Sequence, residues 1–110
     1  TEDVPVGFES LFNGKNLDYN TKITKKIREY AKDYKISTAS LSIAWLLQKG
    51  NNIITIPGTR SVEHLKEHAV GGSFKLSENQ IKEIEDILPV GWCHGDRYSI
   101  TQWEGPEKFC

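Results

Sequence analysis

The stretch NIITIPGTRS, residues 52–61, decides the fold. Its isoleucines and threonine, bounded by Asn and by Pro-Gly, predict a short β-strand over residues 53–56. The strand does not alternate between apolar and polar residues, so both of its faces should be covered, as in a parallel sheet wrapped by helices. It is also the one convincing strand that the sequence predicts. A lone strand leaves buried backbone groups unpaired, at a cost of about 1–3 kcal/mol each, so it needs neighbouring strands.

Helices are predicted on both sides of this strand. Apolar residues at intervals of three and four predict a helix over about residues 20–34, and Ser37 is a favourable N-cap for a second helix that Gly50 ends. A third helix is expected from Ser61 to about residue 70, and a capping box of Ser77 and Gln80 predicts a fourth. The expected units are a loop at 1–19, two helices at 20–50, the strand at 53–56, two helices at 61–88 and a C-terminal tail at 89–110.

This order of elements supports two interpretations of the whole chain. In the first, the chain is part of a larger α/β sheet that supplies the missing strands. In the second, it is a small helical domain in which residues 53–56 are an extended connector, and it acts as a non-catalytic interaction module or a truncated remnant. The residues alone leave both interpretations open.

Composition excludes several classes of function. The chain has 110 residues, with 14 Lys and Arg against 15 Asp and Glu, and a net charge of -1. Such a balance provides no basic surface for nucleic acid or an anionic membrane, and it opposes a helix-turn-helix over residues 20–49. No apolar run approaches the roughly 18 residues of a membrane span. Two cysteines are too few for a disulfide scaffold, and no leader is evident, so we expect a cytoplasmic protein. Cys93 and His94, with Cys110, lack a second close pair of ligands, so no metal site is expected.

A candidate phosphate site follows the predicted strand. The carboxyl end of a strand in a parallel α/β protein is where ligands bind, and the N-terminus of the next helix offers free N–H groups and partial positive charge. Gly58 allows close approach to the backbone, and Thr59 and Ser61 supply hydroxyl groups. Arg60 supplies a planar fork that matches phosphate oxygens.

The helix after this turn has two unlike faces. At about 100° per residue, Arg60, His64, Glu67 and His68 fall on a polar face, and an apolar face opposite them is expected to pack on the protein. Glu67 is placed to accept a hydrogen bond from an exocyclic amine such as that of adenine. The alternative is a solvated helix face with an ordinary N-cap serine.

The sequence IITIPGTRSVEHLKEH, residues 53–68, resembles the last strand and following helix of the aldo-keto reductases. The sequence AWLL at 44–47 resembles the helix before that strand, and FNGKNL at 12–17 is similar to the long loop after the seventh strand. GDRY at 95–98 is similar to a C-terminal motif of a branch that includes fungal and bacterial reductases of pyridoxal-like and aryl aldehydes. The resemblance covers nearly the whole chain.

The resemblance implies a (β/α)8 barrel that reduces small carbonyl compounds with NADPH. Gly58, Thr59, Arg60 and Ser61 would then meet the adenosine 2′-phosphate and ribose, with His64 as a second phosphate-facing residue. Glu67 and His68 would lie beside the adenine, although the family pattern has Asn in place of His68.

A complete barrel needs about 250 residues, so the resemblance makes this chain a C-terminal portion with about one strand. The family's catalytic Asp, Tyr, Lys and His lie on earlier strands and match no position here. The chain alone is therefore expected to be inactive and to require the missing N-terminal barrel portion.

Overall fold

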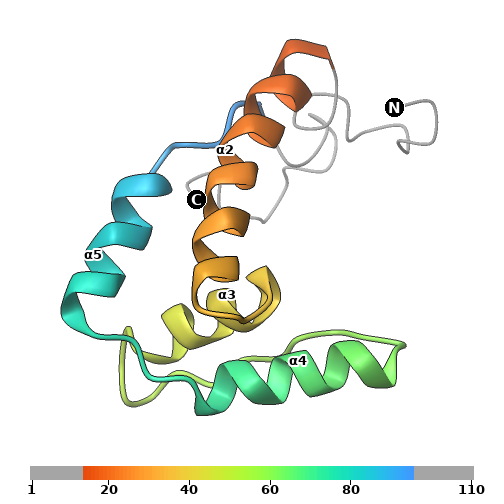
Figure 1. Cartoon of the computed structure of the whole chain (residues 1–110), viewed down its shortest axis with the longest axis vertical. Coiled ribbons are helices and arrows are strands. Elements are labelled where there is room, and N and C mark those ends of the chain that lie inside the picture. Colours follow the sequence, from red (N-terminus) through yellow and green to blue (C-terminus); the bar gives the residue numbers. More distant parts are fainter. Residues whose placement is uncertain (1–13, 96–110) are drawn as a thin grey trace, which may run out of the picture.

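The computed structural model describes residues 14–95, and within that range the chain forms four α-helices (Figure 1). Their bounds are α2 Gly14–Asp33, α3 Thr38–Leu47, α4 Val62–Ser73 and α5 Glu78–Ile87. Helices α2 and α5 contact each other, and α3 packs against both α2 and α4. No helix within residues 14–95 is long and apolar enough to cross a bilayer.

Serine side chains start three of these helices, as the sequence predicts. Ser37, Ser61 and Ser77 each adopt an extended backbone and accept a hydrogen bond from the N–H three residues later. At α5 the reciprocal bond is also present, because the Gln80 side chain accepts from the Ser77 N–H at 2.7 Å. These caps satisfy N–H groups that the helices themselves cannot.

A small apolar core lies where α3 meets the other helices. Leu41 and Ala44 of α3 are each 1% exposed, and the apolar stripe of α2 contributes Ile27 and Ala31. Leu76 and Ile84 complete the buried set. The Gln48 side chain ties the chain before α5 to the end of α3, because its amide donates to the Leu76 carbonyl at 2.6 Å and its oxygen accepts from the Leu76 N–H.

Helices α3 and α4 approach each other closely at Gly71. A Cβ on Gly71 would lie 2.6 Å from the Ser40 carbonyl oxygen and 2.9 Å from the Ile43 Cβ. The buried Ser40 hydroxyl donates to the Glu67 carbonyl at 2.6 Å, one turn before Gly71. Only glycine permits this spacing, so Gly71 sets which side of α4 faces α3.

The expected strand at 53–56 is absent from the described part of the chain. Those residues have no regular secondary structure, and Ile54 and Ile56 are 88% and 93% exposed. The physical reason is that a strand requires a partner for its backbone groups, and no other strand lies within residues 14–95. Both the predicted strand conformation and the expected cover over its two faces are therefore wrong for the described part of the chain.

Several predicted helix bounds are also wrong. Residues 14–19, expected in a loop, belong to α2, because Tyr19 and Asn20 make tertiary contacts with His94 that extend the helix. Helix α3 ends at a Gln48 C-cap rather than at Gly50, and α4 continues through Gly71 and its neighbour to Ser73. The loop at 1–13 and the tail at 96–110 lie outside the described residues.

Two adjacent glycines of α4 provide a matched test of this packing. Gly71→Ala should destabilise the chain by about 1–3 kcal/mol, because the new methyl group overlaps the α3 backbone. Gly72→Ala should be neutral or stabilise by up to about 1 kcal/mol, because nothing lies within 4 Å of its Cβ position and alanine favours helix. Urea denaturation of both variants measures the difference. Equal effects would contradict a close α3–α4 contact.

Candidate functional site

The predicted phosphate turn is an exposed corner at the start of α4. Gly58, Thr59 and Arg60 are all exposed, and nothing lies within 4 Å of a Cβ built on Gly58. The Thr59 hydroxyl accepts from the Ser61 N–H at 3.1 Å and lies 3.2 Å from the Ser61 carbonyl oxygen, to which it donates. This local bonding shapes the turn, so the open backbone at Gly58 does not depend on distant contacts.

The N-terminus of α4 provides the electrostatics of an anion site. The Ser61 hydroxyl accepts from the His64 N–H at 3.4 Å, which leaves the N–H groups of Val62 and Glu63 without intrahelical partners. The partial positive charge of the helix is concentrated there. The exposed Glu63 carboxylate opposes an anion, but Lys66 pairs with it at 3.6 Å and offsets part of its charge.

Arg60 is the cation closest in sequence to this N-terminus. Its side chain is exposed, and it makes no ion pair within the described part of the chain. His64, also exposed, lies one turn into α4. The structure therefore brings Gly58, Thr59, Arg60 and Ser61 together at one corner, with His64 following along the helix.

Glu67 and His68 lie further along α4 and are partly buried. The backbone of Glu67 contacts α3 through Ser40, and His68 Nδ1 is buried with no hydrogen-bond partner among the described residues. Glu67 and His68 are therefore less accessible to a ligand than the exposed turn at Gly58.

The orientation of α4 differs from the sequence expectation. Its apolar face was expected to pack on the protein, yet Val62 is 68% and Leu65 57% exposed, and Ala69 is also exposed. The reason is the close approach at Gly71, which turns the neighbouring Glu67 side of the helix towards α3. An apolar stripe on α4 is left without a neighbour among residues 14–95.

A cluster that the sequence analysis missed joins α2 to α5. The Tyr30 hydroxyl donates to the Glu83 carboxylate at 2.7 Å and lies 3.5 Å from the Tyr34 hydroxyl. Desolvation by burial, with these two hydrogen bonds, raises the pKa of Tyr30, so the phenol stays protonated. Tyr30 and Tyr34 fall on the apolar stripe of α2, and no local pattern pairs them with a residue 53 positions later. The cluster holds two helices together and provides no catalytic base.

No metal site was expected, and within residues 14–95 no three His, Cys, Asp or Glu side chains gather as metal ligands. Cys93 is a half-buried free thiol, and the His94 ring stacks on Tyr19 with centroids 3.5 Å apart. Cys110, the other cysteine, lies outside the described residues.

The family model described as "Aldo/keto reductase family" matches residues 3–89, which is most of the chain and includes the turn and α4. The chain belongs to the aldo/keto reductase family. This family folds as a (β/α)8 barrel, and a helical piece without strands among its described residues is consistent with part of one. The particular branch is not fixed by the match.

Curated relatives agree with this assignment. The chain is 37% identical over 87 residues to "Probable aldo-keto reductase 1" of Glycine max. It is 34% identical over 87 residues to "Aldo-keto reductase yakc [NADP(+)]" of Schizosaccharomyces pombe, and 33% over 88 residues to "Aldo-keto reductase" of Gibberella moniliformis. Each match covers 79–80% of this chain and 25–26% of the relative, so the chain spans about a quarter of their length. No solved structure matches the chain significantly.

A substitution at the N-cap of α4 tests whether Ser61 stabilises the helix N-terminus at the candidate site. Ser61→Ala should destabilise the first turn by about 1 kcal/mol, because the His64 N–H loses its acceptor. Hydrogen exchange of the amides of residues 63–65 should speed up. Ser73→Ala, at the other end of the same helix, is the matched control and should leave them unchanged. Unaltered exchange in Ser61→Ala would show that the cap does not hold this N-terminus.

Proposed function

We propose that the chain is the C-terminal, cofactor-binding portion of an NADP-dependent aldo-keto reductase that reduces aldehydes or ketones. NADPH would supply the hydride for that reaction. The remaining three quarters of such a protein would supply the strands, the catalytic residues and the carbonyl site. The 110-residue chain by itself is proposed to have no reductase activity.

The open corner at residues 58–61 carries this proposal. A phosphate at the start of α4 would meet the first-turn N–H groups, which have no intrahelical partners, and the exposed guanidinium of Arg60. Gly58 would let it approach the backbone, and the hydroxyl groups of Thr59 and Ser61 lie beside it. A terminal 2′-phosphate distinguishes NADP from NAD, so Arg60 would favour NADP through charge-assisted hydrogen bonds. One relative of this chain carries NADP(+) in its name, which supports the same cofactor.

The adenine would lie further along α4. Glu67 would accept a hydrogen bond from the exocyclic amine, and His68 would lie beside the adenine ring. His64, exposed one turn into the helix, would face the phosphate or ribose. Together these seven residues, with Arg60 as the main charge, form the proposed cofactor surface.

The exposed apolar surfaces support the proposal that the chain packs against the rest of a larger protein. Ile54, Ile56, Val62 and Leu65 are each more than half exposed, and they lie on the segment and helix that flank the turn. Strands of the rest of a barrel would pair with residues 53–56, and its helices would cover α4. The same surfaces also fit the second candidate, a helical interaction module without chemistry, which would bind a partner but no cofactor.

Arg60→Ala tests the cofactor assignment in a complete barrel. A chimaera in which this chain replaces the matching quarter of the Glycine max relative would provide that barrel. The substitution should raise the Kd of NADPH by about ten- to a hundredfold, as expected for loss of hydrogen bonds to a charged group. The Kd of NADH should change by less than about twofold. Fluorescence titration with both cofactors measures the difference.

Arg28→Ala is the matched control, because Arg28 is an exposed arginine on α2. It should leave both dissociation constants unchanged. Equal weakening of NADPH and NADH by Arg60→Ala would contradict the 2′-phosphate assignment. A folded chimaera that binds neither cofactor would favour the interaction module.

A further inference from the structure

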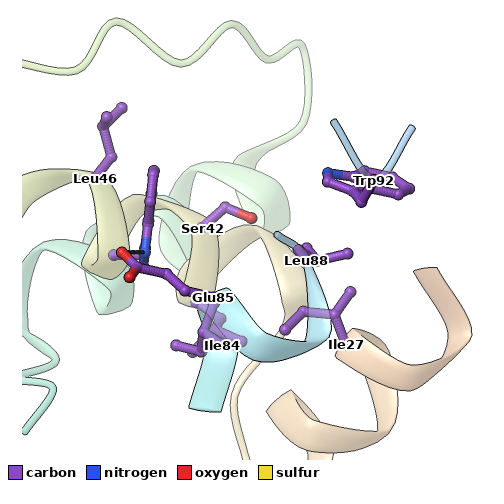
Figure 2. A pocket seen from close by; sticks show the side chains of 9 residues that line it. Ile27, Ser42, Leu46, Ile84, Glu85, Leu88 and Trp92 are labelled. Atoms are coloured by element: carbon purple, nitrogen blue, oxygen red, sulfur yellow. Dashed lines mark hydrogen bonds between the residues drawn. The ribbon is translucent and has the colours of Figure 1, made fainter. Parts of the chain in front are cut away.

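Two lysine–glutamate ion pairs lie within residues 14–95, and they differ in what they join. Lys49 pairs with Glu85 at 2.5 Å, and the Glu85 carboxylate also accepts from the Trp45 indole N–H at 3.2 Å beside an apolar pocket (Figure 2). This pair spans 36 positions of the sequence and holds α5 against the end of α3. Lys66 and Glu63, in contrast, are three residues apart on α4, with their charged atoms 3.6 Å apart. Their pair joins no two elements, so it contributes little to holding the fold.

Glu63 lies where the proposed phosphate would bind. It is the second residue of α4, in the turn whose N–H groups have no intrahelical partners. The Cα–Cβ bonds of a helix tilt towards its N-terminus, so the carboxylate stays close to that first turn. The Glu63 side chain is 79% exposed and therefore faces the same solvent as the turn at residues 58–61. A carboxylate stabilises a helix N-terminus, but it repels a second anion that binds there.

Lys66 limits this repulsion. Its side chain is 70% exposed, and its ammonium pairs with the Glu63 carboxylate from the next turn of α4. Water screens an exposed pair of this kind, so Lys66 neutralises the carboxylate only in part. The turn therefore presents an attractive charge at Arg60 and a partly neutralised opposing charge at Glu63.

We propose that Glu63 lowers the selectivity of this turn for NADP over NAD, and that Lys66 moderates the effect. The inference rests on the proposed function, because it concerns the 2′-phosphate assigned to the same turn. A phosphate monoester carries a charge of about -1.5 to -2 near neutral pH, whereas the 2′-hydroxyl of NAD carries none. The Glu63 carboxylate thus opposes NADP and leaves NAD unaffected, so it works against Arg60.

Adenosine 2′-monophosphate and adenosine differ by this phosphate alone, and they test the proposal on the 110-residue chain. The turn is present in that chain, because local hydrogen bonds of Thr59 and Ser61 shape it. NMR titrations that follow the backbone amides of Arg60 and Val62 measure the Kd of the nucleotide. Adenosine should show no difference between the parent chain and the variants, because it carries no charge.

Glu63→Gln keeps the size of the side chain and removes its charge. It should lower the Kd of adenosine 2′-monophosphate about two- to fivefold at about 0.02 M salt, and the difference should largely vanish at about 0.5 M salt. Lys66→Gln should raise the same Kd by a similar factor at low salt. Glu78→Gln is the matched control, because Glu78 is an exposed carboxylate in the first turn of α5, and it should leave the Kd unchanged.

Arg60→Ala separates failure of this inference from failure of the proposed function. If the nucleotide shifts no amide of the parent chain, or binds equally well to Arg60→Ala, the proposed function fails and the inference fails with it. If Arg60→Ala weakens binding but Glu63→Gln leaves the Kd unchanged at low salt, the inference alone is overturned. Equal effects of Glu63→Gln and Glu78→Gln would also overturn it, because the net charge of the chain would then explain the result.

Discussion

The backbone of residues 53–56 imposes the constraint on which the other features depend. The backbone N–H and C=O groups of a β-strand form a regular hydrogen-bond ladder only with another strand. Isoleucine side chains are also among those most often buried in proteins. Within the described chain these groups find no strand, and Ile54 and Ile56 are almost fully exposed. The same deficit appears on α4, whose apolar stripe at Val62 and Leu65 is uncovered. Both surfaces flank the turn at Gly58, so the proposed cofactor corner and the missing neighbours belong to one region.

Local signals in the sequence predicted the features that local physics controls. The N-caps at Ser37, Ser61 and Ser77 follow from side chains that bond to an N–H three residues away. The turn at residues 58–61 is likewise held by its own Thr59. These features need no knowledge of the rest of the fold, and the candidate site was found for that reason. The cofactor roles of its residues remain predictions.

Features set by distant contacts could not be predicted. Helical periodicity placed the apolar face of α4 against the protein, but the close approach of Gly71 to Ser40 turns another side towards α3. The hydrogen bond from Tyr30 to Glu83 joins residues 53 positions apart, and the hydrogen bond from Asn20 to His94 joins residues 74 positions apart. The start of α2 depends on the second of these. Strand formation at 53–56 is the extreme case, because its pairing partner is not among the described residues.

Hydrogen exchange of the amides of Ile54 and Ile56 tests the central claim most directly. It is compared between the 110-residue chain and the chimaera with the Glycine max relative. Our account predicts exchange close to that of an unstructured peptide in the chain alone and strong protection in the chimaera, where neighbouring strands pair with residues 53–56. Protection in the chain alone, or fast exchange in a folded chimaera, would contradict it.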